Sequence, residues 1–117
     1  MENNNIGSFG EDVTERQLLK KGYEILKRNF RKKCGEIDII AKKDDTIAFV
    51  EVKTRINPVV GLPREAVDIR KQKHIKDTAM LYISENQFYD TNFRFDVAEV
   101  MILDKNVYFN YIENAFF

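Results

Sequence analysis

The sequence predicts an α/β fold in which a central mixed β-sheet is flanked by α-helices. Two stretches show the apolar spacing of helices, and five runs rich in β-branched or aromatic residues show the pattern of strands. A chain of 117 residues has room for one hydrophobic core. We therefore expect residues 1–117 to form a single domain whose first residues, 1–7, are flexible.

The first helix is expected over residues 8–21. Ser8 is a suitable N-cap, and Glu11 follows it at the spacing of a capping box. Gly22 then stands where a glycine commonly ends a helix. Glu11 shares one helical face with the apolar Leu18, so its side chain either caps the helix or points inward towards the sheet.

Three strands are expected after this helix. A short strand within residues 23–30 leads into a basic loop, 31–35. The runs 36–41 and 46–54 are strongly strand-like because β-branched residues dominate them, and the polar turn 42–45 separates the two.

The second half of the chain predicts a helix and two strands. Proline and glycine mark a loop at residues 57–63. The longest helical pattern follows at 64–84, and a loop at 85–92 leads to the strands 93–103 and 107–112. The expected order is thus helix, three strands, helix, two strands.

Composition fits a soluble globular protein, with 44% hydrophobic and 32% charged residues. No window approaches the ~20 apolar residues that span a bilayer, and the polar first residues do not resemble a secretory signal. We therefore expect a cytoplasmic protein. The single cysteine, Cys34, agrees with a reducing compartment.

Charge is distributed unevenly although the formal net charge is zero. Residues 20–33 contain seven basic residues and one acid, Glu24, whereas residues 85–117 contain six acids and two basic residues. This asymmetry predicts a face of positive potential. An ordinary solvated surface is the alternative interpretation.

Two acids lie inside strand-like runs that are otherwise apolar, and such groups are costly to bury unless they are paired or bind a metal. A symmetric hairpin pairs Ile40 with Phe49. The next facing pair on that side of the sheet is Asp38 with Glu51, and Lys53 shares the Glu51 face because strand side chains alternate. Two facing carboxylates repel each other, and a divalent cation between them removes the penalty.

This constellation predicts a metal site that hydrolyses phosphodiester bonds. Mg²⁺ takes one or two carboxylates and keeps several waters, and Mn²⁺ can replace it. The ammonium of Lys53 can orient a bound water and neutralise charge on a phosphoryl oxygen. The alternative is an edge hairpin in which Asp38, Glu51 and Lys53 form ordinary cross-strand ion pairs.

The same residues resemble the D…(D/E)XK signature of restriction-endonuclease-like nucleases. A longer series of short motifs is more specific than this signature. In order and spacing these motifs resemble the YraN-like family, UPF0102, from Gly10 to about Ala115. The matching segments are Gly10-Glu11, Gly22-Tyr23, Gly35-Glu36-Ile37-Asp38, Phe49-Val50-Glu51-Val52-Lys53-Thr54-Arg55 and Arg94-Phe95-Asp96-Val97. Ile37 stands where the signature has its proline, which has no chemical role.

The resemblance implies the restriction-endonuclease-like PD-(D/E)XK fold, close to that of Holliday junction resolvases. It implies a metal-dependent endonuclease acting on DNA, including branched or structured DNA. The implied catalytic residues are Asp38, Glu51, Lys53 and Glu11, and the implied ligands of Mg²⁺ or Mn²⁺ are Asp38, Glu51, Val52 and Glu11. A domain that retains the fold and binds nucleic acid without cleaving it is the second hypothesis.

Contacts to the nucleic-acid backbone are expected from the basic stretch and from residues near the site. The predicted contacts are Lys27, Arg28, Arg31, Lys32, Arg55, Lys71 and Gln72. A homodimer or a partner protein would complete this surface, since the resolvase-like relatives are dimers. His74 has no Cys or His partner of the kind a zinc site needs, so an exposed helix-face histidine is expected. Arg94 and Asp96 share a strand face and predict a structural ion pair.

Overall fold

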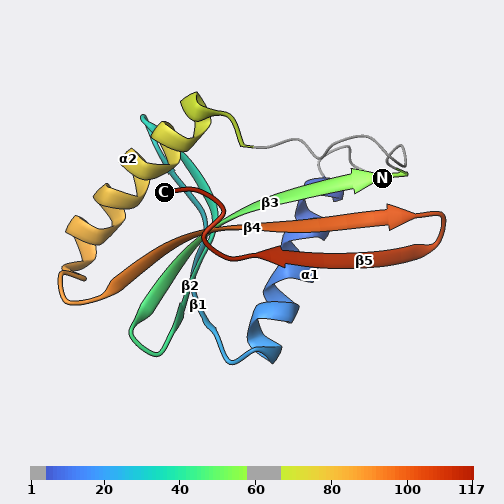
Figure 1. Cartoon of the computed structure of the whole chain (residues 1–117), viewed down its shortest axis with the longest axis horizontal. Helices are drawn as coiled ribbons and strands as arrows, with labels where there is room; N and C mark the ends of the chain where they lie inside the picture. The colour runs from blue at the N-terminus through green and yellow to red at the C-terminus, as the bar shows by residue number, and fades with distance from the viewer. Residues whose placement is uncertain (1–4, 58–66) are drawn as a thin grey trace.

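The computed structural model describes residues 5–57 and 67–117, which form two helices and five strands (Figure 1). Their order is the predicted one: helix, three strands, helix, two strands. The elements are α1 (Asn5–Lys20), β1 (Glu24–Lys32), β2 (Gly35–Lys43), β3 (Thr46–Ile56), α2 (Ile69–Asn86), β4 (Asn92–Leu103) and β5 (Asn106–Ile112).

The five strands form one sheet in the order β1-β2-β3-β4-β5. Strands β3 and β4 are parallel, and the other neighbouring pairs are antiparallel. Parallel neighbours need a long crossover, and α2 lies within that connection. The α/β class and the mixed sheet are thereby confirmed. None of the described helices combines the length and the apolar character that crossing a membrane requires.

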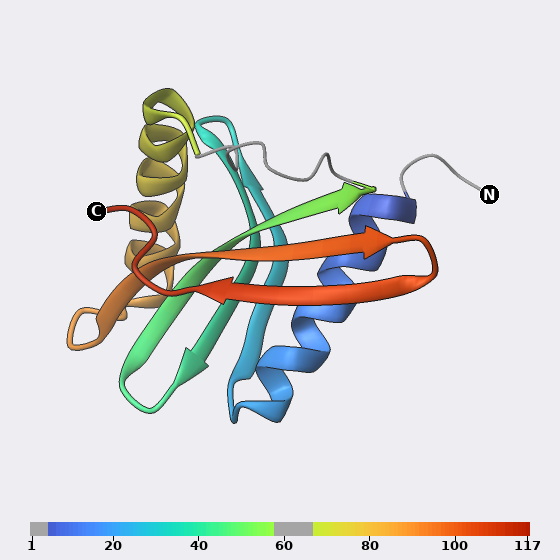
Figure 2. The ribbon, with the colours of Figure 1, turned by 45° about the vertical axis from the view of Figure 1, so that its right-hand side comes forward.

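The two helices cover opposite faces of the sheet (Figure 2). Strand side chains alternate between faces, so neighbouring residues enter different cores. On the α2 face, Ile40 and Phe49 pack with Ile75 and Ala79 of the helix. On the α1 face the core contains Leu18, Tyr23, Ile39, Ala41, Ala48, Val50 and Ala98.

The helix boundaries differ from those expected. Helix α1 begins at Asn5, so residues 5–7 are helical and Ser8 lies inside the helix rather than at its N-cap. No proline lies directly before Ser8, so the helix can include Ile6 and the weak helix former Gly7. Helix α2 was expected from residue 64, but Val67 and Asp68 precede it, and residues 64–66 lie outside the described ranges.

Side-chain and backbone caps fix the two ends of α2. The Asp68 carboxylate accepts a hydrogen bond from the Lys71 amide at 2.8 Å, which makes Asp68 the N-cap. Gln87 adopts a left-handed conformation with φ 56° and ends the helix. The predicted loop at residues 57–63 is described only at Asn57.

Strand β1 is longer than the sequence indicated. It pairs with β2 as far as Lys32 opposite Gly35, so Arg31 and Lys32 belong to the strand and the turn contains only Lys33 and Cys34. Backbone pairing with a buried neighbour therefore overrides the polar composition of this segment.

The predicted ion pair between Arg94 and Asp96 is confirmed. Arg94 Nε donates to both Asp96 oxygens at 2.9 and 3.0 Å, and the Tyr111 hydroxyl and the Asn114 amide donate at 2.5 and 3.0 Å. The Arg94 guanidinium also donates to the Tyr23 hydroxyl. Asp96 is fully buried with its hydrogen bonds satisfied, so this network ties β4 to β5 and the C-terminal segment.

Helix α1 lies unusually close to β3 at Gly10. A Cβ atom at this position would lie 1.9 Å from Thr54 Oγ1 and 3.2 Å from Thr54 Cβ. Threonine has a stiff χ1 angle and cannot move its hydroxyl aside cheaply. The absence of a side chain at residue 10 therefore sets the approach of α1, and with it the position of Glu11.

We expect Gly10→Ala to lower the free energy of unfolding by about 1–3 kcal/mol, the usual cost of overpacking. Gly7 in the same helix has no atom within 4 Å of an added Cβ, so Gly7→Ala is expected to be neutral or to stabilise by up to about 1 kcal/mol. Urea denaturation measures both changes. Thr54→Ala should restore part of the stability lost in Gly10→Ala, and equal effects at the two glycines would contradict this account.

Candidate functional site

The hairpin formed by β2 and β3 positions two acids beside each other. Its predicted register is confirmed, because Ile40 pairs with Phe49. The ladder stops at the pair of Ile39 and Val50, one position before the expected facing pair of acids. There the Asp38 carboxylate itself accepts a hydrogen bond from a β3 backbone amide.

That hydrogen bond runs from Val52 N to Asp38 Oδ2 and is 2.8 Å long. The prediction that Asp38 and Glu51 form a regular cross-strand pair is therefore wrong in detail. Two facing carboxylates repel, and opening the ladder lets one of them bind the backbone instead. Because β2 and β3 are interior strands of the sheet, the alternative of an edge hairpin does not hold.

Burial and a second acid make the charged form of Asp38 costly. Burial raises the pKa of Asp38 most, and the neighbouring Glu51 raises it further, to about 8. The Val52 hydrogen bond works in the opposite direction, and the negative charge of Glu11 adds a smaller upward contribution. Glu51 is only 8% exposed. Below about pH 8, and with no metal bound, Asp38 therefore keeps its proton.

Lys71 at the start of α2 contacts the second acid. Its Nζ atom lies 2.9 Å from Glu51 Oε2, close enough for an ion pair. Oε2 is buried and has no other polar partner among the described residues, so its charge is compensated by this ion pair. Partial burial lowers the pKa of Lys71, but Glu51 and Asp38 outweigh that effect and raise it above its ordinary value.

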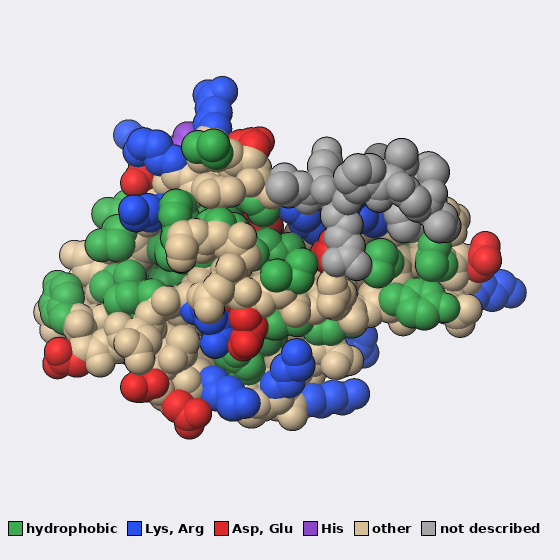
Figure 3. All heavy atoms as spheres, viewed as in Figure 1, with side chains coloured by type: hydrophobic (Ala, Val, Ile, Leu, Met, Phe, Trp, Pro, Cys, Tyr) green, Lys and Arg blue, Asp and Glu red, His purple; other side chains and the backbone are tan. Residues whose placement is uncertain are grey.

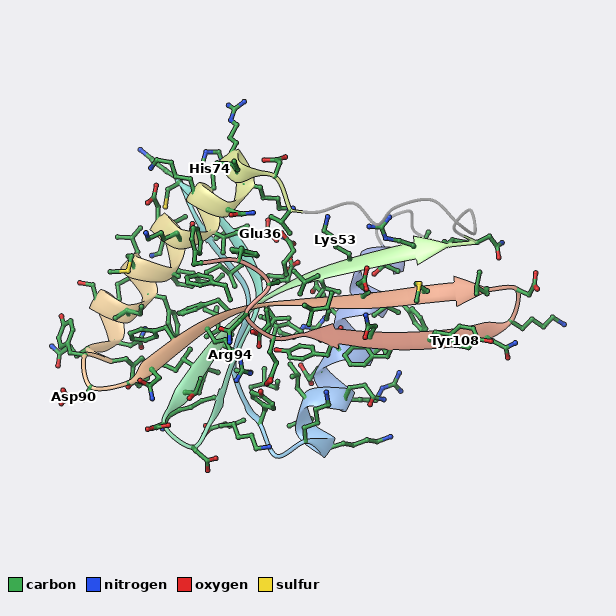
Figure 4. All side chains as sticks on the ribbon, viewed as in Figure 1. Glu36, Lys53, His74, Asp90, Arg94 and Tyr108 are labelled. Atoms are coloured by element: carbon green, nitrogen blue, oxygen red, sulfur yellow. The ribbon has the colours of Figure 1, made fainter. Side chains whose placement is uncertain are left out.

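The acid pair opens into a pocket of about 440 Å³ between α2 and the β2–β3 strands. Figure 4 shows Glu36, Lys53 and His74 on the same side of the sheet, around the N-terminal part of α2. The lining residues are Gly35, Glu36, Asp38, Glu51, Asp68, Arg70, Lys71, His74 and Ile75. Arg70 and His74 were not among the predicted site residues. The signal that could have revealed them is the dense run of basic residues at 70–76.

Lys53 lies two residues beyond Glu51 and is half-buried on β3. Among the described residues no ion pair includes Lys53, so the alternative of a cross-strand ion pair to this lysine is not observed. Its partner in the parallel ladder is Glu99 of β4, a carboxylate that is 2% exposed and accepts a hydrogen bond from Asn110 at 3.0 Å. Sequence reasoning missed Glu99, although it too is an acid inside an apolar run.

The Glu11 side chain faces the sheet. Of its two predicted roles, capping the helix or pointing inward, the structure therefore agrees with the second. Its Oε1 atom accepts hydrogen bonds from Arg28 at 3.2 Å and from Asn29 at 3.1 Å. In residues 5–57 and 67–117 no group of three or more His, Cys, Asp or Glu residues is arranged to hold a metal. Glu11 is thus near enough for its charge to affect Asp38, but it is not gathered with the pair as a third ligand.

Most of the predicted backbone-binding cations on β1 are already paired with acids. Arg28 contacts three carboxylates on α1, those of Glu11, Asp12 and Glu15. Arg31 and Lys32 form ion pairs with Glu36 at 3.2 Å and Glu85 at 2.9 Å, and Lys27 is exposed.

Two other residues predicted to contact nucleic acid, Gln72 and Arg55, have polar side-chain atoms that face the protein itself. Gln72 Nε2 donates to the Val67 carbonyl at 2.7 Å and so belongs to the start of α2. The Nε and Nη2 atoms of Arg55 are buried and have no hydrogen-bond partner among the described residues. Cys34 Sγ lies 3.3 Å from Thr78 Oγ1, a contact that involves no nucleophile-activating base.

Fold and pocket together define an α/β protein in which a half-buried and a buried carboxylate lie beside a cationic helix. The sequence profile of the "Uncharacterised protein family UPF0102" matches residues 10–100. The chain is 50% identical over 116 residues to a UPF0102 protein of Clostridioides difficile, covering 99% of this chain and 100% of the relative. It therefore belongs to the UPF0102 family.

Further UPF0102 relatives match over almost their whole length. One from Alkaliphilus oremlandii is 47% identical over 116 residues, which is 97% of this chain and 99% of the relative. Another from Caldicellulosiruptor bescii is 50% identical over 114 residues, or 95% and 96% of the two chains. The family identified from the sequence motifs is confirmed.

The raised pKa of Asp38 predicts a pH dependence of stability in metal-free buffer. An unfolded chain releases the Asp38 proton near pH 4, whereas the folded protein holds it to about pH 8. The stabilisation is therefore fully present below about pH 4 and is lost as the pH rises through about 8. Asp38→Asn keeps an acceptor for the Val52 amide but cannot ionise.

We expect Asp38→Asn to be more stable than wild type at pH 8.5 by about 1–2 kcal/mol, with the difference shrinking at pH 5. Urea midpoints in EDTA at the two pH values measure it. Asp90→Asn, at an exposed position, is the matched control and should show no such pH-dependent gap. A difference that is the same at both pH values would contradict the assignment.

Proposed function

We propose that this protein is a metal-dependent endonuclease that hydrolyses phosphodiester bonds in DNA and has the restriction-endonuclease-like PD-(D/E)XK fold. The observation that carries the proposal is the pair of half-buried Asp38 and buried Glu51 in the lining of one pocket, followed by Lys53 on the same strand face as Glu51. Buried acids without enough compensating partners are a common mark of functional sites.

The chemistry of the donor set fits Mg²⁺ or Mn²⁺. Both acids supply hard oxygen ligands, although a cation at Glu51 Oε2 would compete with the Lys71 ammonium 2.9 Å away. A bound divalent cation would remove the repulsion that raises the pKa of Asp38. When bound, it supplies charge neutralisation and an activated water for phosphodiester hydrolysis.

The chain's own residues then have separate tasks. Asp38 and Glu51 would hold the cation, and the Val52 amide fixes the orientation of Asp38 through its hydrogen bond. Lys53 would neutralise the charge that develops on the phosphoryl group. Asp38 must lose its proton before it can bind a cation, so metal affinity is expected to fall as the pH drops below about 8.

The second candidate is a nucleic-acid-binding domain of the same fold that cleaves nothing. Its specific support is that only two carboxylates converge in the described part of the chain, and that Lys71 already contacts one of them. An internal ammonium can compensate the charge of Glu51 without any metal. The two candidates differ in whether a divalent cation binds at the pair.

Lys71→Met tests whether the pocket is a cation site. Removing an ammonium that lies 2.9 Å from Glu51 also removes its repulsion of an incoming metal. For this half-exposed lysine the effect is about 1 kcal/mol, so we expect Mn²⁺ to bind roughly five times more tightly. Isothermal titration calorimetry measures the affinity, and Lys76→Met, on the same helix but outside the pocket, is the control. Weaker Mn²⁺ binding in Lys71→Met would contradict the expectation.

Cleavage of DNA tests the proposed activity directly. We expect wild type to cut labelled linear and four-way-junction DNA with Mg²⁺ or Mn²⁺. Lys53→Met is expected to lower the rate by about 10²–10³-fold with little change in DNA affinity, because its charge would act mainly in the transition state. Asp38→Ala is expected to lose both Mn²⁺ binding and cleavage.

The control is Asp90→Asn, which changes an exposed acid far from the pocket (Figure 4) and should cleave like wild type. If wild type binds DNA but cuts nothing with either metal, and Asp38→Ala has no effect on Mn²⁺ affinity, the non-cleaving candidate is correct.

A further inference from the structure

Three side chains of α2 form a rim along one wall of the acid pocket. They are Arg70, Lys71 and His74, here called the α2 rim, and all three are exposed. Figure 3 shows basic side chains gathered around the histidine over the start of α2. Residues 69–76 include four Lys or Arg residues and no acid. A dense positive charge thus borders a pocket whose base is acidic.

Within this rim Lys71 is paired with Glu51, but Arg70 is more available than the paired arginines and lysine of β1. Arg28 is held by three carboxylates of α1, and its side chain is only 27% exposed. Arg70, by contrast, is exposed and forms no ion pair with any of the described residues. A cation without an internal partner keeps its whole charge for a ligand, whereas a paired cation must first lose its partner.

The spacing of the rim suits successive phosphates. Arg70 and His74 are four residues apart, so they lie on one side of the helix about 5–6 Å from each other. Lys71 lies between them in sequence and points to Glu51. A phosphodiester held at the acid pair would therefore have its neighbouring phosphate within reach of Arg70 or His74.

Lys76 provides an internal comparison on the same helix. Its ammonium lies over the ring of Phe117, 5.1 Å from the centroid, and it does not line the pocket. Arg70 and Lys76 carry the same charge on the same element but lie on different sides of it. Substitutions of Arg70 and Lys76 therefore distinguish the effect of losing one positive charge from the effect of losing it beside the pocket.

We infer that the α2 rim is the surface that binds the phosphodiester backbone of a nucleic-acid strand and leads it to the Asp38–Glu51 pair. This inference rests on the proposed function for the identity of the ligand. It assigns backbone binding to Arg70 and His74 rather than to the basic stretch of β1. Because phosphate contacts carry no sequence information, the binding is independent of sequence.

The experiment measures the salt dependence of DNA affinity without cleavage. Fluorescence anisotropy in EDTA follows binding of the full chain to a labelled 30-nucleotide single strand and to the corresponding duplex, from 50 to 300 mM salt. Each lost phosphate contact lowers the slope of log affinity against log salt by roughly 0.7 for a single strand and 0.9 for a duplex. We expect a drop of this size for Arg70→Gln, and a weaker affinity without a large slope change for His74→Gln.

Two matched variants control for charge and position. Arg70→Lys keeps the charge and should retain the wild-type slope, while Lys76→Gln and Lys27→Gln each remove one charge elsewhere and should leave it unchanged. Melting temperatures verify that every variant is folded, which the exposure of these residues favours.

The inference is overturned if Arg70→Gln has the wild-type slope, or if Lys76→Gln lowers the slope as much as Arg70→Gln does. It is also overturned if Lys27→Gln alone carries the effect, because the strand would then lie along β1. None of these binding measurements depends on whether the protein cleaves DNA. Binding at the rim by a protein that never cleaves DNA would refute the endonuclease and leave the rim assignment intact.

Discussion

The hydrogen bond from the Val52 amide to the Asp38 carboxylate is the interaction on which the site depends. It replaces a strand-to-strand bond at the end of the β2–β3 ladder and holds Asp38 beside Glu51. Two acids confined in this way cannot both carry their charge without compensation. The raised pKa of Asp38 and the approach of Lys71 to Glu51 are two responses to the same electrostatic cost.

The sheet topology supplies the rest of the pocket. Because β3 and β4 are parallel, the chain must cross from one end of the sheet to the other, and α2 lies in that crossover. Gly35 lets the helix approach β2 closely, since a Cβ there would lie 2.9 Å from Thr78 Oγ1 and 3.0 Å from the His74 carbonyl. The first turns of α2 therefore stand directly beside the acids, and their cations become part of the site.

Tertiary contacts decide which basic side chains of this protein are compensated by acids and which are not. The basic run on β1 is the most conspicuous cationic segment of the sequence, yet Arg28, Arg31 and Lys32 each contact acids from other elements. A sequence count cannot show this compensation because the partners are distant along the chain. The less conspicuous run on α2 retains Arg70 without an internal acid among the described residues.

The sequence by itself determined the order and type of the elements and the β2–β3 register, because both follow from local periodicity and turn position. It also singled out Asp38, Glu51 and Lys53, since charged residues within apolar strands are conspicuous. Caps such as Asp68 were less visible, because a cap depends on where the backbone leaves the helix.

Only the tertiary structure decided what surrounds the acid pair. Lys71, Arg70 and His74 reach it through a crossover from another part of the chain. The close packing of α1 at Gly10 brings Glu11 near enough for its charge to act on Asp38. Such proximity depends on how helices pack on the sheet, and no spacing within one segment encodes it.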